Sequence, residues 1–116
     1  MNLLLKKKVE IVRLKIVREA SFRTLAKVES PESAHEVFRQ FLGTDVDREA
    51  CALLCLDVKH RPTVIQMVSM GTLDRSLIHP REVFKTAILA NAAAIIYAHW
   101  HPSGDPEPSP EDVRMT

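Results

Sequence analysis

Two histidines and an aspartate near the C-terminal end of the sequence are suited to binding a metal ion. His99 and His101 are two residues apart, so on an extended segment both rings point to one side and Trp100 points to the other. Ten residues lie between His101 and Asp112, which is at the third position of a helix start that begins at Ser109. Two imidazoles and one carboxylate, with water in the fourth position, are typical of catalytic zinc. Residues 99–112 are therefore a candidate metal-binding loop.

The segment between these candidate ligands is rich in proline. Four of the seven prolines lie between Pro102 and Pro110. They lower the entropy that is lost when the helix start is held near the histidines. Ser103 and Asp105 are expected to shape the loop around Gly104 through side-chain turn hydrogen bonds. Asp105 is also an alternative metal ligand, although this is the less favoured interpretation.

Hydrolysis of an amide also needs a carboxylate that moves a proton without binding the metal. The sequence has no H-E-x-x-H pair to supply it. Glu49 is the best candidate, because it begins an otherwise apolar stretch that sheet pairing could bring beside His99. On these grounds alone, a surface charge at the end of a strand is an equally good interpretation of Glu49.

The apolar pattern predicts a mixed α/β fold with the element order β-α-β-β-α-β. One helix begins at Ser30-Pro31 and ends before Gly43, and a second begins at Pro80 and carries small residues from Ala90 to Ala94. Strands are predicted at residues 9–17, 49–57, 63–70 and 94–98.

The remaining cysteines and histidines are interpreted as structural. Cys51 and Cys55 share one face of a buried strand, which favours core thiols over metal ligands or a redox pair. Two cysteines without an export signal fit a reducing cytoplasm. The other histidines, His35, His60 and His79, are expected to be structural or exposed. For His79 the alternative is that it lines the cleft at the metal site.

The candidate residues and their spacing resemble the JAMM (MPN-plus) metallopeptidase motif, E…H-x-H-P-x6-S-x-x-D. The stretches D-R-E-A-C-A-L-L-C-L-D and H-W-H-P-S-G-D-P-E-P-S-P-E-D are similar to the bacterial RadC branch of that family. The resemblance covers Val9 to Thr116, and the motif is carried by Glu49, His99, His101, Pro102, Ser109 and Asp112.

The resemblance implies a cytidine-deaminase-like mixed sheet flanked by helices, and one Zn²⁺ per chain. It implies that His99, His101 and Asp112 bind the zinc, that Glu49 is the acid/base, and that Ser109 helps to stabilise the oxyanion. The implied activity is a zinc-dependent metallopeptidase-type hydrolysis of peptide or isopeptide bonds in a peptide or protein substrate.

The sequence departs from the family pattern in three ways. Trp100 stands where RadC-like chains more often have Asn, which bears on substrate fit more than on metal binding. The N-terminal helix-hairpin-helix region that RadC proteins often carry is not evident. The family domain continues past the aspartate with a helix and strands, so we expect C-terminal elements to be missing after residue 116.

Size and charge limit the other functions. A chain of 116 residues is expected to form one domain, residues 1–116, with a basic leader at 1–8 and no membrane span. The net charge of +1 argues against a general nucleic-acid binder. Residues 1–18 nevertheless hold six basic side chains and one acidic one, so a DNA-associated accessory module is the alternative function. A scaffold with a relic metal site is a third possibility, against which the intact motif speaks. The oligomeric state is open, and a cytoplasmic location is expected.

Overall fold

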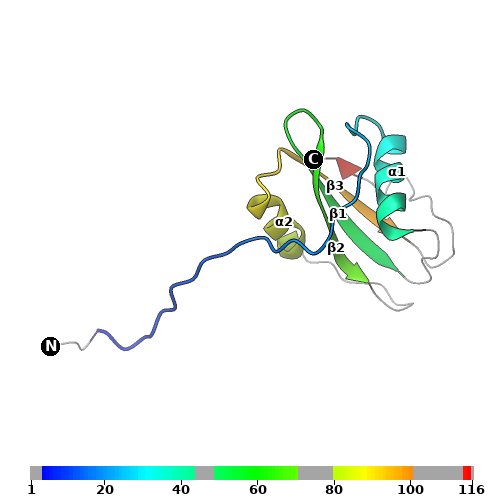
Figure 1. Cartoon of the computed structure of the whole chain (residues 1–116). Coiled ribbons are helices and arrows are strands. Elements are labelled where there is room, and N and C mark those ends of the chain that lie inside the picture. Colours follow the sequence, from blue (N-terminus) through cyan, green and yellow to red (C-terminus); the bar gives the residue numbers. More distant parts are fainter. Residues whose placement is uncertain (1–3, 44–48, 71–79, 101–113, 116) are drawn as a thin grey trace.

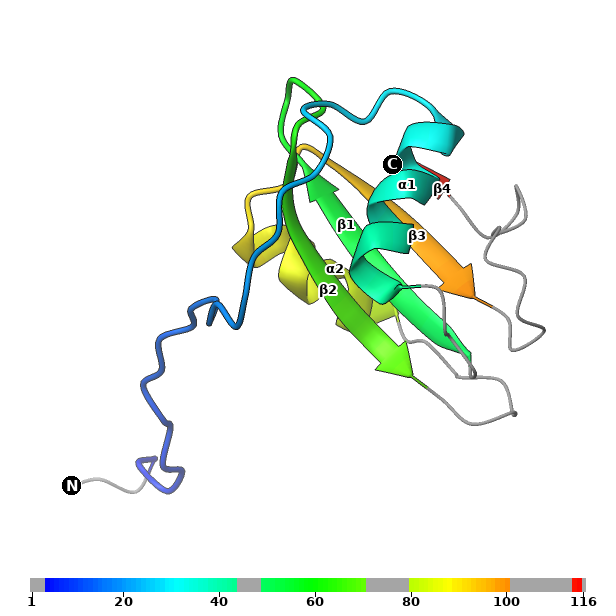
Figure 2. The ribbon, with the colours of Figure 1, turned by 45° about the vertical axis from the view of Figure 1, so that its right-hand side comes forward.

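The computed structural model describes residues 4–43, 49–70, 80–100 and 114–115, and these form a sheet between two helices. The sheet is antiparallel, with strand order β2-β1-β3-β4, and the helices lie on its opposite faces (Figures 1 and 2). The predicted mixed α/β class is confirmed. The elements are α1 (Pro31–Leu42), β1 (Ala50–Leu56), β2 (Pro62–Met70), α2 (Pro80–Leu89), β3 (Ala94–Trp100) and β4 (Arg114–Met115).

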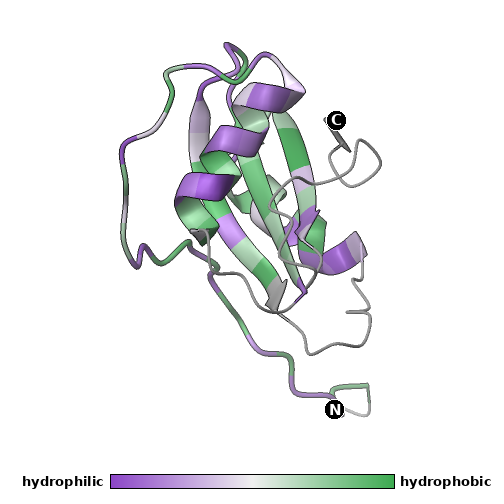
Figure 3. Ribbon diagram, turned by 90° about the vertical axis from the view of Figure 1, so that its right-hand side faces the viewer, coloured by the Kyte–Doolittle hydropathy of each residue, from purple (hydrophilic) through white to green (hydrophobic). Residues whose placement is uncertain are grey.

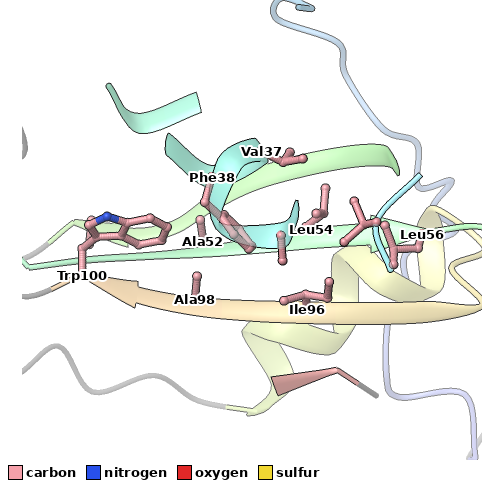
Figure 4. Packing of buried hydrophobic residues seen from close by; sticks show 11 residues of the cluster. Val37, Phe38, Ala52, Leu54, Leu56, Ile96, Ala98 and Trp100 are labelled. Atoms are coloured by element: carbon pink, nitrogen blue, oxygen red, sulfur yellow. The ribbon is translucent and has the colours of Figure 1, made fainter. Parts of the chain in front are cut away.

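Strand β1 lies at the centre of the sheet, and all seven of its residues are buried. Its even-numbered side chains and those of β3 pack against α1, whereas Leu53, Cys55 and Ile95 pack on the α2 side. Because side chains alternate between the two faces along β1, its one apolar run contributes to two cores. Figure 4 shows the core on the α1 side, which includes Val37, Phe38, Ala52, Leu54, Leu56, Ile96, Ala98 and Trp100.

Helix α1 begins and ends where its sequence signals predict. Ser30 caps the first turn, accepting a hydrogen bond from the Ser33 backbone N–H at 3.1 Å, and the Ser33 hydroxyl accepts one from the Ser30 backbone N–H at 3.0 Å. Gly43 ends the helix with a φ of 78°, a conformation in which glycine avoids the strain of a side chain. The polar residues of α1 face outward and its apolar residues face the sheet (Figure 3).

Helix α2 is shorter than the sequence predicted and buries none of its residues fully. It ends at Leu89 because Asn91 adopts a left-handed conformation, with a φ of 53°, and the Ala92 N–H bonds to the Ala87 carbonyl. The prediction that the helix continues through Ala90 to Ala94 was therefore wrong. Ala87, Ala90 and Ala92 still pack on the sheet, as expected of small residues. The Thr86 hydroxyl also bonds to the Gln66 side chain of β2.

The strand predicted near the N-terminal end of the chain was wrong. Residues 9–17 form no strand, and their apolar side chains are exposed, Ile11 completely. Alternating residues stabilise a strand only when a neighbouring strand is paired with them, and no described strand is. Arg114 and Met115 form β4, paired with Tyr97 and Ile96, and the helix start predicted at Ser109 precedes them. Ser109 itself lies outside the described residues. Among the helices described, none has the length and apolar character to cross a membrane.

The turn between β1 and β2 is closed by Asp57. Its Oδ1 accepts hydrogen bonds from the backbone N–H groups of Lys59 and Arg61, both at 2.9 Å, and its Oδ2 accepts one from Arg61 Nε at 2.7 Å. The hydrogen bond from the Arg61 backbone, together with the other bonds from Arg61 and Lys59, lowers the pKa of Asp57 below its ordinary value of 3.8.

The lowered pKa makes the contribution of Asp57 to stability depend on pH. The carboxylate is favoured in the folded state, so its contribution is present above a pH of about 3.8 and is lost as pH falls through the lowered pKa. We expect Asp57→Asn to reduce the free energy of unfolding at neutral pH, and the difference from wild type to shrink in acid. Urea unfolding at neutral pH and at a pH below 3.8 measures this, with the exposed Glu29→Gln as control. A difference that does not change with pH would contradict the assignment.

Candidate active site

Glu49 is the only buried polar or charged residue among those described, and 7% of it is exposed. It immediately precedes β1, at the end of the sheet where β3 finishes. The apolar run that follows fixes its position, since every residue of β1 is buried. The structure therefore does not support the alternative that Glu49 is an exposed charge at the end of a strand.

The pairing of β1 with β3 brings Glu49 and His99 to the same face of the sheet. Cys51 lies directly opposite His99, and Ala50 lies opposite Trp100. Directly opposite residues share a face, and continuing the alternation of β1 by one step places Glu49 on the face of Cys51. Glu49 and His99 are then diagonal neighbours, with Cα atoms roughly 7–8 Å apart, within reach of long side chains. His99 is half-buried.

Trp100 points to the opposite face and belongs to the core. It is 2% exposed, and its ring packs edge-on against Phe38 with the centroids 5.4 Å apart (Figure 4). The predicted separation of His99 and Trp100 onto opposite faces is confirmed. The resemblance linked Trp100 to substrate fit, whereas its side chain has a packing role, which the alternation of β3 against α1 could have indicated.

The other predicted site residues lie outside the described part of the chain. Within the described ranges, no group of three or more histidine, cysteine, aspartate or glutamate side chains is placed to hold a metal ion. Glu49 and His99 are the two motif residues whose positions the structure gives. Those outside it are His101, Pro102, Ser109 and Asp112 of the motif, with His79, Ser103 and Asp105 of the weaker predictions.

Comparison with known proteins identifies the family. Residues 28–116 match the model of the RadC-like JAB domain, and this is more than half of the chain. The chain belongs to the RadC-like JAB domain family. The two predicted features that the structure describes, a buried Glu49 and a His99 at the end of the paired strand, thus occur in a RadC-like JAB domain.

Curated relatives support the same assignment. A UPF0758 protein of Syntrophomonas wolfei is 45% identical over 92 residues, which cover 77% of this chain and 39% of that protein. A UPF0758 protein of Trichodesmium erythraeum is 45% identical over 92 residues, covering 79% of this chain and 37% of that protein. A third, from Desulforudis audaxviator, is 53% identical over 70 residues, covering 60% and 30%. This RadC-like chain therefore spans well under half the length of these relatives.

The cysteines and the remaining described histidines of this RadC-like domain agree with their structural interpretation. Cys51 and Cys55 are buried free thiols, and burial raises the pKa of Cys55. His35 is half-buried on α1, and His60 is exposed in the turn between β1 and β2. Of these four residues, Cys51 alone is a direct neighbour of a motif residue, since it pairs with His99.

Proposed function

We propose that this RadC-like JAB chain is a zinc-dependent hydrolase of peptide or isopeptide amides. The observation that carries the proposal is the buried carboxylate of Glu49 on the face of the sheet that also holds His99. Removing a carboxylate from water costs free energy. A role in proton transfer explains why the one buried acidic side chain of the described residues lies beside a candidate metal ligand.

The donor atoms of the motif residues suit zinc. His99 supplies an imidazole nitrogen, and His101 and Asp112, which the motif adds, would supply a second nitrogen and a carboxylate oxygen. Three such ligands leave one position for water. Zinc held by these residues would polarise the scissile carbonyl and lower the pKa of a bound water to roughly 7.

Glu49 would move the proton during hydrolysis. Its carboxylate would accept a proton from the attacking water and then deliver it to the leaving amine. This role needs a side chain that is near the ligands but does not bind the metal itself, and the diagonal relation of Glu49 to His99 is compatible with it. The Ser109 hydroxyl would donate a hydrogen bond to the developing oxyanion.

Removal of a proposed ligand should remove the metal. We expect the purified wild-type chain to hold about one zinc ion. His99→Ala should weaken zinc binding by more than the 10–100-fold that loss of an outer-shell partner typically costs. Elemental analysis after dialysis against a weak chelator measures this. His60→Ala is the matched control, because His60 is exposed in the β1–β2 turn, and it should retain zinc.

Two results would contradict the metal site. One is a wild-type chain without zinc, and the other is a His99→Ala chain that keeps as much zinc as the His60→Ala control. Circular dichroism of both variants checks that they remain folded, and His99→Asn provides a smaller change in volume at the same half-buried position.

A DNA-associated accessory role is the second candidate. The basic side chains between residues 6 and 18 are exposed, which favours contact with phosphates, whereas the nearly balanced charge of the whole chain does not. Binding to duplex DNA that weakens steeply with salt would support it. We also propose a cytoplasmic location for this chain, whichever of the two functions holds, because its two cysteines are free thiols.

A further inference from the structure

The chain carries an N-terminal segment, Val9–Val17, whose apolar side chains are in water. It is extended and runs away from the sheet (Figures 1 and 2). Val9, Val12 and Leu14 are each more than 70% exposed. Apolar groups exposed in this number indicate a surface that a partner covers. Within the segment, Val12, Leu14 and Ile16 alternate with Arg13 and Lys15, the pattern of a half-buried strand.

Strand β2 has an edge that no described strand covers. It pairs with β1 along one edge, and no described strand pairs with its other edge. Val64 and Val68 pack on the α2 side of the sheet, and Ile65 and Met67 on the α1 side, but all four are only partly buried. Apolar residues on both faces are typical of an interior strand. The free edge of β2 therefore has the composition of a strand that is covered by another strand.

A groove lies beside the first four residues of β2. It encloses about 790 Å³, within the range of roughly 300–1,000 Å³ found for ligand clefts. Residues 16–22 form one wall and residues 62–65 of β2 form the other, with Phe41 of α1 and Leu89 of α2 also lining it. The groove thus lies between an edge strand and a length of chain that is not hydrogen-bonded to it as a strand.

We propose that the N-terminal segment of a second copy of this chain occupies the groove and adds as a strand to β2. The exchange is reciprocal, so each copy donates its segment and receives that of its partner around a two-fold axis. Val12 and Leu14 then face the apolar lining of the partner's groove, Ile16 stays in the wall of its own groove, and Arg13 and Lys15 remain in solvent. One contact then covers the edge of β2 and the side chains of Val12 and Leu14, whereas Val9 and Ile11 share the solvent face of Arg13 and Lys15.

The position of residues 16–22 in the wall of the groove favours entry of the segment from a second copy over entry of the chain's own segment. Residues 16–22 already form that wall, so residues 9–15 of the same chain would have to reverse direction at about Lys15–Arg18 to enter. The sequence there is K-I-V-R, which lacks the Gly, Pro, Asn, Asp and Ser that form tight turns and includes two stiff β-branched residues. A segment from another copy enters without this reversal.

The size of the contact fits a stable dimer. Each copy contributes the nine residues of its segment and fifteen further residues that line the groove. Stable interfaces involve about 20–30 residues on each side. The contact is symmetric and closed, so it ends at two copies and does not continue into a fibre.

Proline substitutions in the exposed chain test this dimer. Leu14 and Leu5 are 72% and 74% exposed, so neither contributes to the core of a single copy. Proline at position 14 removes a backbone donor within the added strand, whereas position 5 lies before the segment. We expect wild type and Leu5→Pro to sediment as dimers, and Leu14→Pro to dissociate at least tenfold more readily. An excess of a synthetic peptide of residues 9–17 should convert wild-type dimers to monomers.

Four outcomes would overturn the proposal. The first is a monomeric wild-type chain, including one whose amides at 9–17 are protected from hydrogen exchange, because the segment would then dock on its own copy. The second is a dimer that Leu14→Pro and Leu5→Pro leave equally stable. The third is a dimer that the peptide does not dissociate. The fourth is self-association that occurs only when duplex DNA is added.

Discussion

Glu49→Gln should lower the rate of amide cleavage by about 10²–10⁴-fold, the contribution typical of a positioned general acid or base. Glutamine has nearly the shape of glutamate but cannot accept and return the proton. The buried position of Glu49 makes this change specific, because no other described acidic residue is buried and able to take over. Bound zinc should be retained, since the proposed ligands are His99, His101 and Asp112.

Cleavage and metal content have to be measured on the same samples. A pool of synthetic peptides, some with isopeptide-linked lysines, provides the substrates, and mass spectrometry detects the products. Glu82→Gln is the matched control, because Glu82 is exposed on α2 and pairs only with Lys85 at 3.4 Å among the described ion pairs. It should leave both cleavage and zinc unchanged.

The possible results separate the role of Glu49 from the existence of the site. Equal turnover by Glu49→Gln and wild type would remove Glu49 from proton transfer and leave the metal assignment intact. Loss of zinc in Glu49→Gln would make Glu49 a ligand instead. A wild-type chain that binds zinc but cleaves no peptide would contradict the hydrolase assignment while leaving the metal site.

The elements that the sequence predicted correctly depend on local chemistry. The serines around Pro31 and the glycine after Leu42 determine where α1 begins and ends, because capping is completed within a few residues. The uninterrupted apolar run of β1 similarly requires burial on both faces, wherever the neighbouring strands come from.

The errors arose where the outcome depends on distant partners or on one backbone angle. Alternation in residues 9–17 indicates which side chains could be buried together, but it does not show whether a sheet edge is available to them. The end of α2 was placed too late because the alanines after Leu89 favour a helix, whereas Asn91 tolerates the left-handed conformation that ends it.

In the candidate site, too, local sequence predicts one feature, whereas another depends on distant segments. Alternation along β3 was sufficient to predict that His99 and Trp100 point to opposite faces. The neighbourhood of Glu49 and His99 depends on the register in which β1 meets β3, a relation between segments far apart in the chain. A shift of this register by one residue would move Glu49 to the face opposite His99. The motif resemblance suggested that the two residues are neighbours, and the structure supplied the register.

Trp100→Ala should reduce the free energy of unfolding by about 3–5 kcal/mol, the range for large aromatic residues in a core. The indole is almost completely buried on the α1 side and packs at 64° against the ring of Phe38. Such aromatic pairs add about 0.5–1.5 kcal/mol beyond the burial of their area. Urea unfolding with linear extrapolation measures the loss, and Trp100→Phe should recover part of it.

This experiment also decides between packing and substrate fit for the residue between the two motif histidines. Val58→Ala is the control, because Val58 is 82% exposed in the β1–β2 turn and should change stability by no more than about 0.5 kcal/mol. If Trp100 acts through packing, folded Trp100→Phe should keep the zinc and the cleavage pattern of wild type, since the indole lies on the opposite face from His99. A Trp100→Ala chain as stable as the Val58→Ala control, but with altered cleavage, would instead place the side chain in contact with substrate.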